Sequence, residues 1–463
     1  MPKLTILWTD VFVWLMVIAA LFYIWRVQYS PALRSAWRSV FYTPSAVASA
    51  VILSFFVLVG VLDSVHYRSE LPTLAGQTEV RYEPVARSLL DDVLDGVRLA
   101  KKERSYSSPL ATHLFFKESQ IINGEAKRDF PRLEQGAIHL QQLEQHAYDL
   151  WQLGAWSAAA TLTVFALVGL GCRRGYKKQP AFPWRSLWFS LSLLLSLLIV
   201  IGIYSRFYYL LGTDRSGNDV IFQSFKSIRT ALVIGTLTTL AMLPPAIGFG
   251  VAAGYFKGWV DDVIQYVYTT MTSIPGILLI AASVLMMQVY MDTHSDYFDT
   301  VASRADSRLV MLCLILGLTG WATLCRFLRA ETLKLRELEY IQAARAFGVS
   351  HWGIMRKHLL PNLMHLVLIT MVLEFSGLVL YEAVLSYLGI GVDPSMPSFG
   401  TMIDAARLEM SRDPMIWWNL LGAFVFLLAL VLSANIFADA VQRAFDPRAR
   451  RVAPARPVEV SNA

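Results

Sequence analysis

The sequence predicts an all-α polytopic membrane protein of about nine transmembrane helices, with one small helical insertion outside the membrane. Of its 463 residues, 55% are hydrophobic and the mean hydropathy is +0.46, which excludes a single soluble domain. Apolar runs of about 20 residues recur between short loops, and about 20 such residues span a bilayer as a helix. Only residues 63–150 break this pattern with a long charged stretch.

Charge and cysteine content add no further chemistry. The formal net charge is +6, but the basic residues concentrate in short loops between spans, as the positive-inside rule produces, so no nucleic-acid partner is expected. The three cysteines, Cys172, Cys313 and Cys325, lie in or next to apolar spans and show neither metal nor disulfide spacing.

Residues 1–62 hold two predicted spans, Ile6 to Trp25 and Ser45 to Leu62. The first lacks a small-residue cleavage site and is followed by arginines, so we expect it to be retained. Residues 63–150 form the insertion, which the topology places outside the cytoplasm. Leu90, Val93, Leu94 and Val97 share one helical face there, and a second helix is expected from about Leu133 towards Leu150. A structural cap and a contact surface for a partner protein both fit this insertion.

A transmembrane hairpin follows over residues 151–210, with the basic turn Arg173–Lys178 between its spans. Residues 211–450 hold the last five spans, at about 228–255, 263–289, 310–327, 363–388 and 416–437. Pro244, Pro245 and Pro275 fall inside two of them and predict helix kinks. Residues 451–463 form a polar tail.

The segment 329–362 is polar and helix-forming although it lies between two spans, so we expect it at the membrane surface, where a partner docks. Leu335, Leu338, Ile341 and Ala344 have the spacing of an amphipathic helix that Gly348 ends. A second helix is expected from Ser350 to Pro361.

This segment resembles the EAA loop of the permeases of binding-protein-dependent ABC importers. The pattern falls on Gln342, Ala343, Ala344, Gly348, His358, Leu360 and Pro361, with Gln342 in place of Glu and His358 in place of Ile. The resemblance implies that an ATPase subunit docks here and assigns coupling to Gln342, Ala343, Ala344, Arg345, Gly348, Leu360 and Pro361. An ordinary helix in a cytoplasmic loop is the alternative.

Two further segments resemble the dipeptide and oligopeptide permeases. In Leu211–Val220, Asp214 and Asp219 either cap helix starts or order a polar plug at the pore entrance. In Leu380–Gly391, the resemblance places Glu382, Gly389 and Gly391 at the translocation path or outer gate, while helix packing by Glu382 fits equally well. A carboxylate inside a span should face a pore or a partner, and Glu382 is a better candidate than Glu374.

The resemblance implies an ABC importer type I permease core over residues 211–450, in a non-enzymatic subunit that most resembles transporters of di- and oligopeptides. The implied partners are a second permease subunit, two ABC ATPases, an extracytoplasmic substrate-binding protein and membrane lipid. No Gly-x4-Gly-Lys-Ser/Thr loop occurs, so ATP and Mg are expected on the ATPase subunits. The expected location is the bacterial cytoplasmic membrane, with the N-terminus outside and the C-terminus in the cytoplasm.

Two other classes of protein remain possible at this point. A proton-coupled secondary transporter would use Glu374 and Glu382, and a membrane receptor would use residues 63–150. A metal site at His351, His358 and His365 is not expected, because Pro361 should interrupt the helix and no carboxylate stands at ligand spacing.

Overall fold

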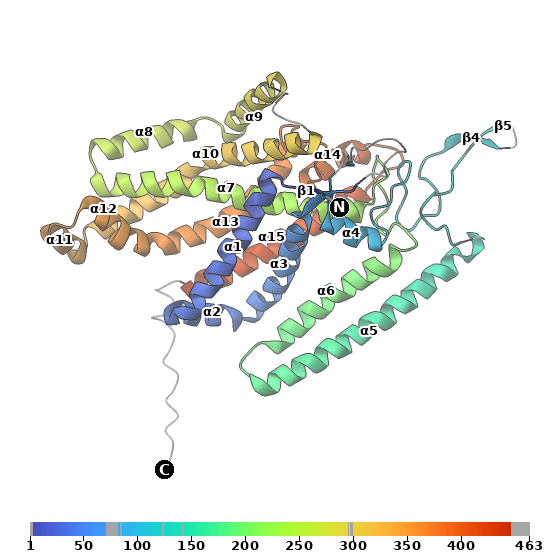
Figure 1. The fold of residues 1–463 in the computed structure, drawn as a ribbon, viewed down its shortest axis with the longest axis horizontal. Helices are drawn as coiled ribbons and strands as arrows, with labels where there is room; N and C mark the ends of the chain where they lie inside the picture. The colour runs from blue at the N-terminus through green and yellow to red at the C-terminus, as the bar shows by residue number, and fades with distance from the viewer. Residues whose placement is uncertain are drawn as a thin grey trace, which may run out of the picture.

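The computed structural model describes residues 3–70, 82–83, 86–122, 125–140, 143–294, 296 and 300–445. Long helices run between two ends of the molecule, with α11 and α12 at one end and the strands β4 and β5 at the other (Figure 1). Within these residues, nine helices are long and apolar enough to cross a membrane, in agreement with the prediction. The tail 451–463 lies outside the described residues.

The elements have the following bounds. They are β1 (Lys3–Thr5), α1 (Trp8–Tyr29), α2 (Pro31–Phe41), α3 (Pro44–Asp63), β2 (His66–Arg68), β3 (Arg87–Ser88), α4 (Leu89–Gly96), β4 (Glu118–Ile122), β5 (Glu125–Asp129), α5 (His146–Lys178), α6 (Trp184–Tyr204), α7 (Val220–Phe256), α8 (Trp259–Ser273), α9 (Gly276–Thr293), α10 (Val301–Arg336), α11 (Glu339–Ala346), α12 (His351–Ile354), α13 (Leu360–Tyr387), α14 (Phe399–Met410) and α15 (Trp418–Phe445).

Helices α7 and α10 form the central pair of the fold. Their backbones approach closely because α7 presents glycines, and a Cβ at Gly250 or Gly254 would lie 2.8 Å from the carbonyl oxygen of Cys325 or Arg329 of α10. Gly235 makes room in the same way for Phe375 of α13 on another side of α7. Small residues at helix interfaces are what membrane helices need for close packing.

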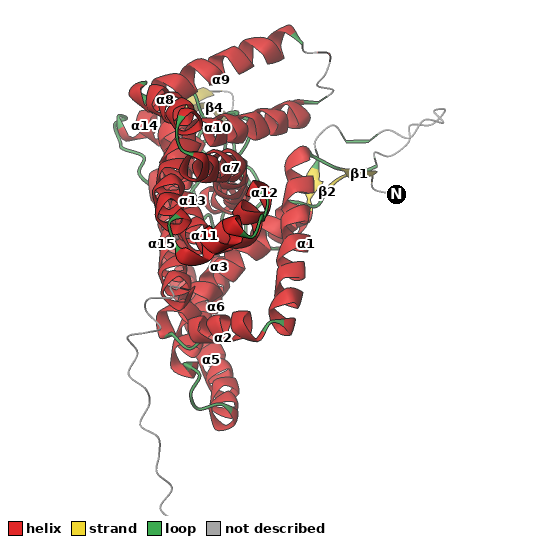
Figure 2. Ribbon diagram, turned by 90° about the vertical axis from the view of Figure 1, so that its left-hand side faces the viewer, coloured by secondary structure: helices red, strands yellow, loops and turns green. Residues whose placement is uncertain are grey.

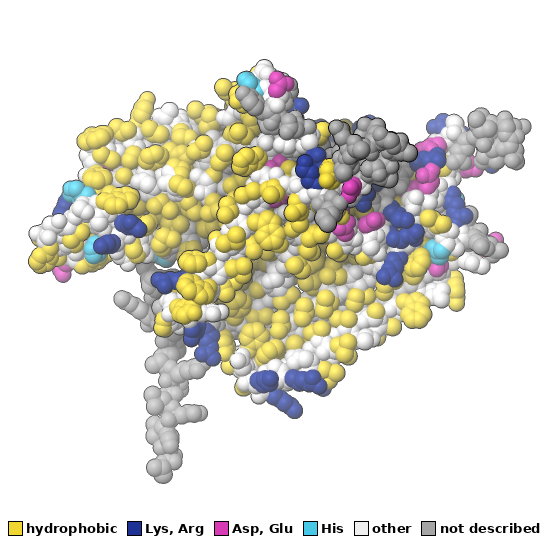
Figure 3. All heavy atoms as spheres, viewed as in Figure 1, with side chains coloured by type: hydrophobic (Ala, Val, Ile, Leu, Met, Phe, Trp, Pro, Cys, Tyr) yellow, Lys and Arg dark blue, Asp and Glu magenta, His cyan; other side chains and the backbone are white. Residues whose placement is uncertain are grey.

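Helix α3, rather than α6, belongs to the packed core. It lies against α7 and α15, with a T-shaped contact between Phe55 and Phe225. The α5–α6 hairpin packs onto α3 from outside and shows a broad hydrophobic surface, with basic side chains gathered at its turn (Figure 3).

Two predictions about prolines need correction. The span expected at 263–289 is divided, because α8 ends at Ser273, Ile274 is extended and α9 begins after Pro275. A residue before proline is disfavoured in the helical region, so Pro275 separates two helices instead of kinking one.

The helix expected to close at Pro361 instead continues into α13. A π turn over Met355–Leu359 widens the backbone just before this proline, which lacks the N–H of a regular helical bond. Helix α7 is continuous across Pro244 and Pro245, and their kink stays a prediction.

The insertion has less helix than expected. Helix α4 is present, but the second helix predicted from Leu133 towards Leu150 is wrong before His146, where α5 begins. The insertion also contributes β2 and β3 to a three-stranded sheet and forms the β4–β5 hairpin. Strand β1 pairs with β2, which brings the described N-terminal residues to the insertion end of the molecule.

Candidate functional site

A tight turn separates the two helices of the coupling loop, which we define as residues 329–362. Gly348 has φ of 78°, the left-handed conformation that glycine adopts without strain. Its N–H donates to the carbonyl of Arg345, and the N–H of Val349 donates to that of Ala344, at 3.1 Å each. This pattern is the Schellman motif, which satisfies the last carbonyls of α11.

Tyr255, at the end of α7, holds the coupling loop in place. Its hydroxyl lies 2.8 Å from Nδ1 of His351, and its carbonyl accepts a hydrogen bond from Arg336. The guanidinium of Arg345 lies over its ring, 5.7 Å from the centroid. Tyr255 is 1% exposed, so it connects the loop rigidly to the core helices. This role could not be predicted from the sequence, because the contacts join residues about 80 to 100 positions apart.

Apolar side chains anchor the coupling loop from beneath. Ile341, Ile354 and Leu359 are buried in one cluster with residues of α7 and α10. Leu360, which the family pattern singled out, is only partly buried, and Pro361 is exposed at the start of α13. Asn362 donates to the Tyr340 hydroxyl at 3.1 Å and thereby joins α13 to α11.

The free side of the coupling loop is an apolar surface that faces away from the molecule. Phe347 is 87% exposed and Trp352 is 68% exposed. Gln342, Ala343 and Arg345 are also exposed, and Ala344 is partly covered. α11 and α12 are seen from this side in Figure 2. Exposed aromatic side chains beside small residues are typical of a protein interface.

At the opposite end, Asp214 and Asp219 order the backbone before α7. The Asp214 carboxylate accepts from the N–H groups of Ser216 and Asn218 at 2.8 and 2.9 Å. Asp219 is the N-cap of α7 and accepts from the N–H of Ile221 at 2.7 Å. Burial raises the pKa of Asp219 to about 7. These contacts give both residues the capping role, and a contact with substrate remains a prediction.

The insertion is fastened to the same loop. Gly212 and Gly217 have φ of 69° and 74°, and a Cβ on Gly217 would lie 1.8 Å from the carbonyl oxygen of Glu103. The N–H of Glu103 donates to the Gly217 carbonyl at 2.8 Å. The buried Glu103 carboxylate accepts from three successive N–H groups, those of residues 134–136. We call this contact between residues 98–116 and 211–220 the outer seam.

Glu382 lies inside the protein, between α13 and α14. It is 2% exposed and accepts hydrogen bonds from Ser386 and Ser398, at 2.7 and 3.0 Å. Ser398 is itself the N-cap of α14. Gly389 has φ of 76°, and a Cβ on Gly391 would collide with Ser386. These contacts give Glu382 and Gly391 a packing role, Gly389 supplies a turn with positive φ after α13, and lining of the path by the three residues remains a prediction.

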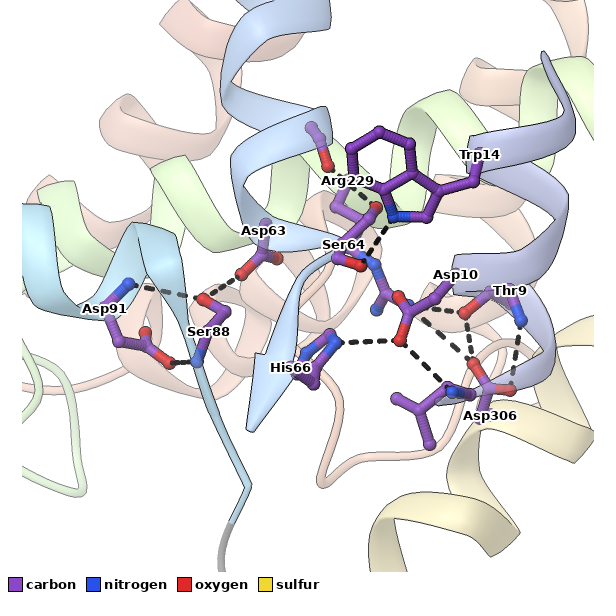
Figure 4. A network of polar contacts seen from close by, with 12 residues as sticks. Thr9, Asp10, Trp14, Asp63, Ser64, His66, Ser88, Asp91, Arg229 and Asp306 are labelled. Atoms are coloured by element: carbon purple, nitrogen blue, oxygen red, sulfur yellow. Dashed lines mark hydrogen bonds and ion pairs between the residues drawn. The ribbon is translucent and has the colours of Figure 1, made fainter. Parts of the chain in front are cut away.

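A buried ionic network joins α1 to the core (Figure 4). The Arg229 guanidinium of α7 lies 2.6 Å from the carboxylate of Asp10, which also contacts His66 at 2.9 Å. Thr9 donates from its N–H to Asp306 of α10 at 3.2 Å. Nearby, Lys226 pairs with Asp63 and Asp91, at 2.6 and 3.0 Å. The network fixes α1, α3, α7 and α10 relative to one another.

The histidines make local contacts. His365 donates from Nδ1 to the Asn362 carbonyl of its own helix at 2.8 Å, while His351 contacts Tyr255. Within the described part of the chain, no group of three or more His, Cys, Asp or Glu residues is placed to hold a metal ion.

A bundle of helices that are long and apolar enough to cross a membrane, with an exposed loop mounted on its core at one end, is typical of a membrane transport subunit. The chain belongs to the family described as binding-protein-dependent transport system inner membrane components, whose sequence profile matches residues 246–451. It is a permease subunit of an ABC importer, and the comparisons give no support to a secondary transporter or a receptor.

Characterised relatives are similar over the same region. The chain is 30% identical over 240 residues to the oligopeptide transport system permease protein OppC of Mycobacterium tuberculosis, covering 52% of this chain and 76% of OppC. It is 27% identical to the dipeptide transport system permease protein DppC of Bacillus subtilis, over 52% of this chain and 69% of DppC. It is 34% identical to the peptidoglycan transport system permease protein YejE of Agrobacterium fabrum, over 51% of this chain and 57% of YejE.

Proposed function

We propose that this permease subunit carries di- or oligopeptides into the cytoplasm, and that ATPase subunits drive it through the coupling loop. The main observation in support of this proposal is the exposed apolar surface around Phe347 and Trp352, which is attached to the core through Tyr255. A force applied to this surface would pass directly into α7 and α10. The names of OppC and DppC favour peptides as the substrate class.

The complete transporter would contain a second, different permease subunit, two ATPases that bind ATP and Mg, and a substrate-binding protein. ATP hydrolysis would then belong to the ATPases and not to this chain. The coupling loop would lie in the cytoplasm, so the insertion and the N-terminus would lie outside and the C-terminus inside. The pairing of β1 with β2 supports this orientation, because it keeps the N-terminal strand with the insertion.

The test is purification of the tagged full-length chain from its native membrane in mild detergent, with identification of co-purifying proteins. We expect a Walker-motif ATPase, a second multispan protein and a binding protein. A chain that purifies alone and still moves solute on a proton gradient would overturn the proposal.

A further inference from the structure

Glu374 is a carboxylate at the middle of a membrane span. It lies about 20 Å from either end of α13, at 1.5 Å of rise per residue. A carboxylate at this depth is costly unless water or a cation solvates it, and such residues usually mark transport pathways. The side chain therefore requires a partner.

The part of the chain that the structure describes supplies no such partner. Glu374 is partly exposed, and within the described residues no hydrogen bond or ion pair reaches its carboxylate. Glu382, eight residues further on, is in contrast buried and accepts from two serine hydroxyls. The sequence favoured Glu382 as the path residue, but Glu382 has polar partners inside the protein, whereas Glu374 has none among the described residues.

The surface around Glu374 is open. Gly377, one turn further along α13, is exposed, and a Cβ built there would meet no atom within 4 Å. Tyr381 lies two turns from Glu374 on the same face of α13 and packs, as Ile315 of α10 does, against a buried cluster of α9, α10 and α13 side chains. Its hydroxyl lies 3.9 Å from the Cβ position of Gly276, beside the break between α8 and α9. Glu374 therefore faces the same side of the bundle as this break.

Helices α8 and α10 carry polar side chains between the coupling loop and the break between α8 and α9. Because α10 and α13 are antiparallel, one and two turns from Ile315 towards the coupling loop lead to Thr319 and Thr323, of which Thr323 is exposed. On α8, the exposed residues Asp262, Tyr266, Thr269 and Ser273 have the spacing of one helical stripe. An acyl chain could solvate none of these groups, whereas a water-filled passage would solvate all of them.

We propose that Glu374 lines the translocation path at mid-depth and receives the α-ammonium group of the transported peptide. This assignment rests on the proposed function, because charge complementarity is what selects an ammonium group as the occupant. The carboxylate would offer a transient site at which the peptide exchanges hydration for an ion pair, between the outer seam and the coupling loop.

The test measures how charge at position 374 affects a neighbouring thiol. In the reconstituted complete transporter, with Cys172→Ser to remove the partly exposed native thiol, the Gly377→Cys variant is treated with a cationic or an anionic methanethiosulfonate reagent. A negative unit charge about 6 Å away in water raises the local concentration of the cationic reagent about threefold and lowers that of the anionic reagent about threefold. Adding Glu374→Gln should therefore lower the ratio of the cationic to the anionic labelling rate about tenfold. Glu374→Asp should preserve the ratio.

Leu162→Cys on α5 is the matched control. Leu162 is 71% exposed in this chain but lies on the apolar outer hairpin, so both reagents should leave it unmodified. A transported peptide with a free amino group should slow labelling of Gly377→Cys when Glu374 is present, and its N-acetylated form should not.

Three results would overturn the proposal. They are a Gly377→Cys thiol that never reacts in any nucleotide state, a rate ratio that ignores the charge at position 374, and equal protection by the free and the acetylated peptide. An unreactive thiol would indicate that lipid or the second permease covers this face. Absence of ATP-dependent peptide uptake by the unmodified transporter would instead refute the proposed function. The labelling ratio would still show whether Glu374 lies on a water-accessible face of α13.

Discussion

The turn at Gly348 should decide whether the coupling loop transmits force. A side chain at this position would meet no atom within 4 Å, so a substitution disturbs the backbone and not the packing. An L-residue at φ of 78° pays about 1–2 kcal/mol, and a β-branched one up to about 3 kcal/mol. Since 1.4 kcal/mol is a tenfold change in an equilibrium constant, Gly348→Val should depopulate the observed turn by about ten- to a hundredfold.

The assay is ATPase activity stimulated by binding protein and peptide in proteoliposomes. We expect Gly348→Val to insert normally into the membrane but to lose most of this stimulation. Gly348→Asn is the control, because asparagine tolerates the left-handed region, and it should retain most of the activity. Full stimulation in Gly348→Val would refute the role of the turn, and equal failure of both variants would show that space for the partner, not φ, sets the requirement.

Further expectations concern the contacts that mount the loop, the insertion and α1. Tyr255→Phe removes a hydrogen bond worth about 1 kcal/mol and should weaken stimulated ATPase activity without lowering the amount of folded protein, as checked by gel filtration. Gly217→Ala should lower the melting temperature of the purified protein clearly more than Gly258→Ala, because both glycines have positive φ but only Gly217 is in close contact with a neighbouring backbone. Arg229→Met leaves Asp10 buried without its cation and should destabilise the protein by about 3–5 kcal/mol in thermal unfolding, with partial recovery when Asp10→Leu is added. Burial raises the pKa of Asp219 to about 7, so the folded state binds the proton of this carboxyl more tightly than the unfolded state does. The contribution of Asp219 to the free energy of unfolding should therefore fall as pH rises from about 4 to about 7, and Asp219→Asn should flatten this pH dependence.

Each of these variants has a result that would contradict the structure. Unchanged stimulation of ATPase activity in Tyr255→Phe would show that the buried apolar side chains hold the coupling loop in place without the Tyr255 hydrogen bond. Equal melting temperatures for the two glycine variants would show that the outer seam is not packed as described. A stable Arg229→Met protein would mean that Asp10 finds water or another cation, and an unchanged pH profile in Asp219→Asn would assign the titration to another group.

The sequence was sufficient for features that depend on local pattern. Apolar run length predicted the number of spans, although it merged α8 and α9 into one, and residue type predicted the turn at Gly348. Asp219 was recognised as a possible cap because it precedes an apolar helix. These signals work because helix ends and membrane spans are decided within a few residues of chain.

The remaining features depend on contacts between distant residues. Tyr255 lies in an apolar helix end, and nothing in its neighbourhood indicates that His351 and Arg345 converge on it. Glu374 and Glu382 look alike in sequence, and only the position of Ser398 shows that Glu382 is satisfied inside the protein. The helix continues through Pro361 because a π turn precedes this residue. No residue pattern in the sequence predicts this turn.

The central claim is that ATP hydrolysis on partner subunits drives peptide uptake through this chain. The most direct measurement is accumulation of a labelled peptide in proteoliposomes that contain the complete complex, with ATP supplied only on the side of the coupling loop. We expect uptake that requires both ATP and the binding protein and that Gly348→Val strongly reduces. Uptake that follows a proton gradient without ATP, or that persists in Gly348→Val, would contradict it.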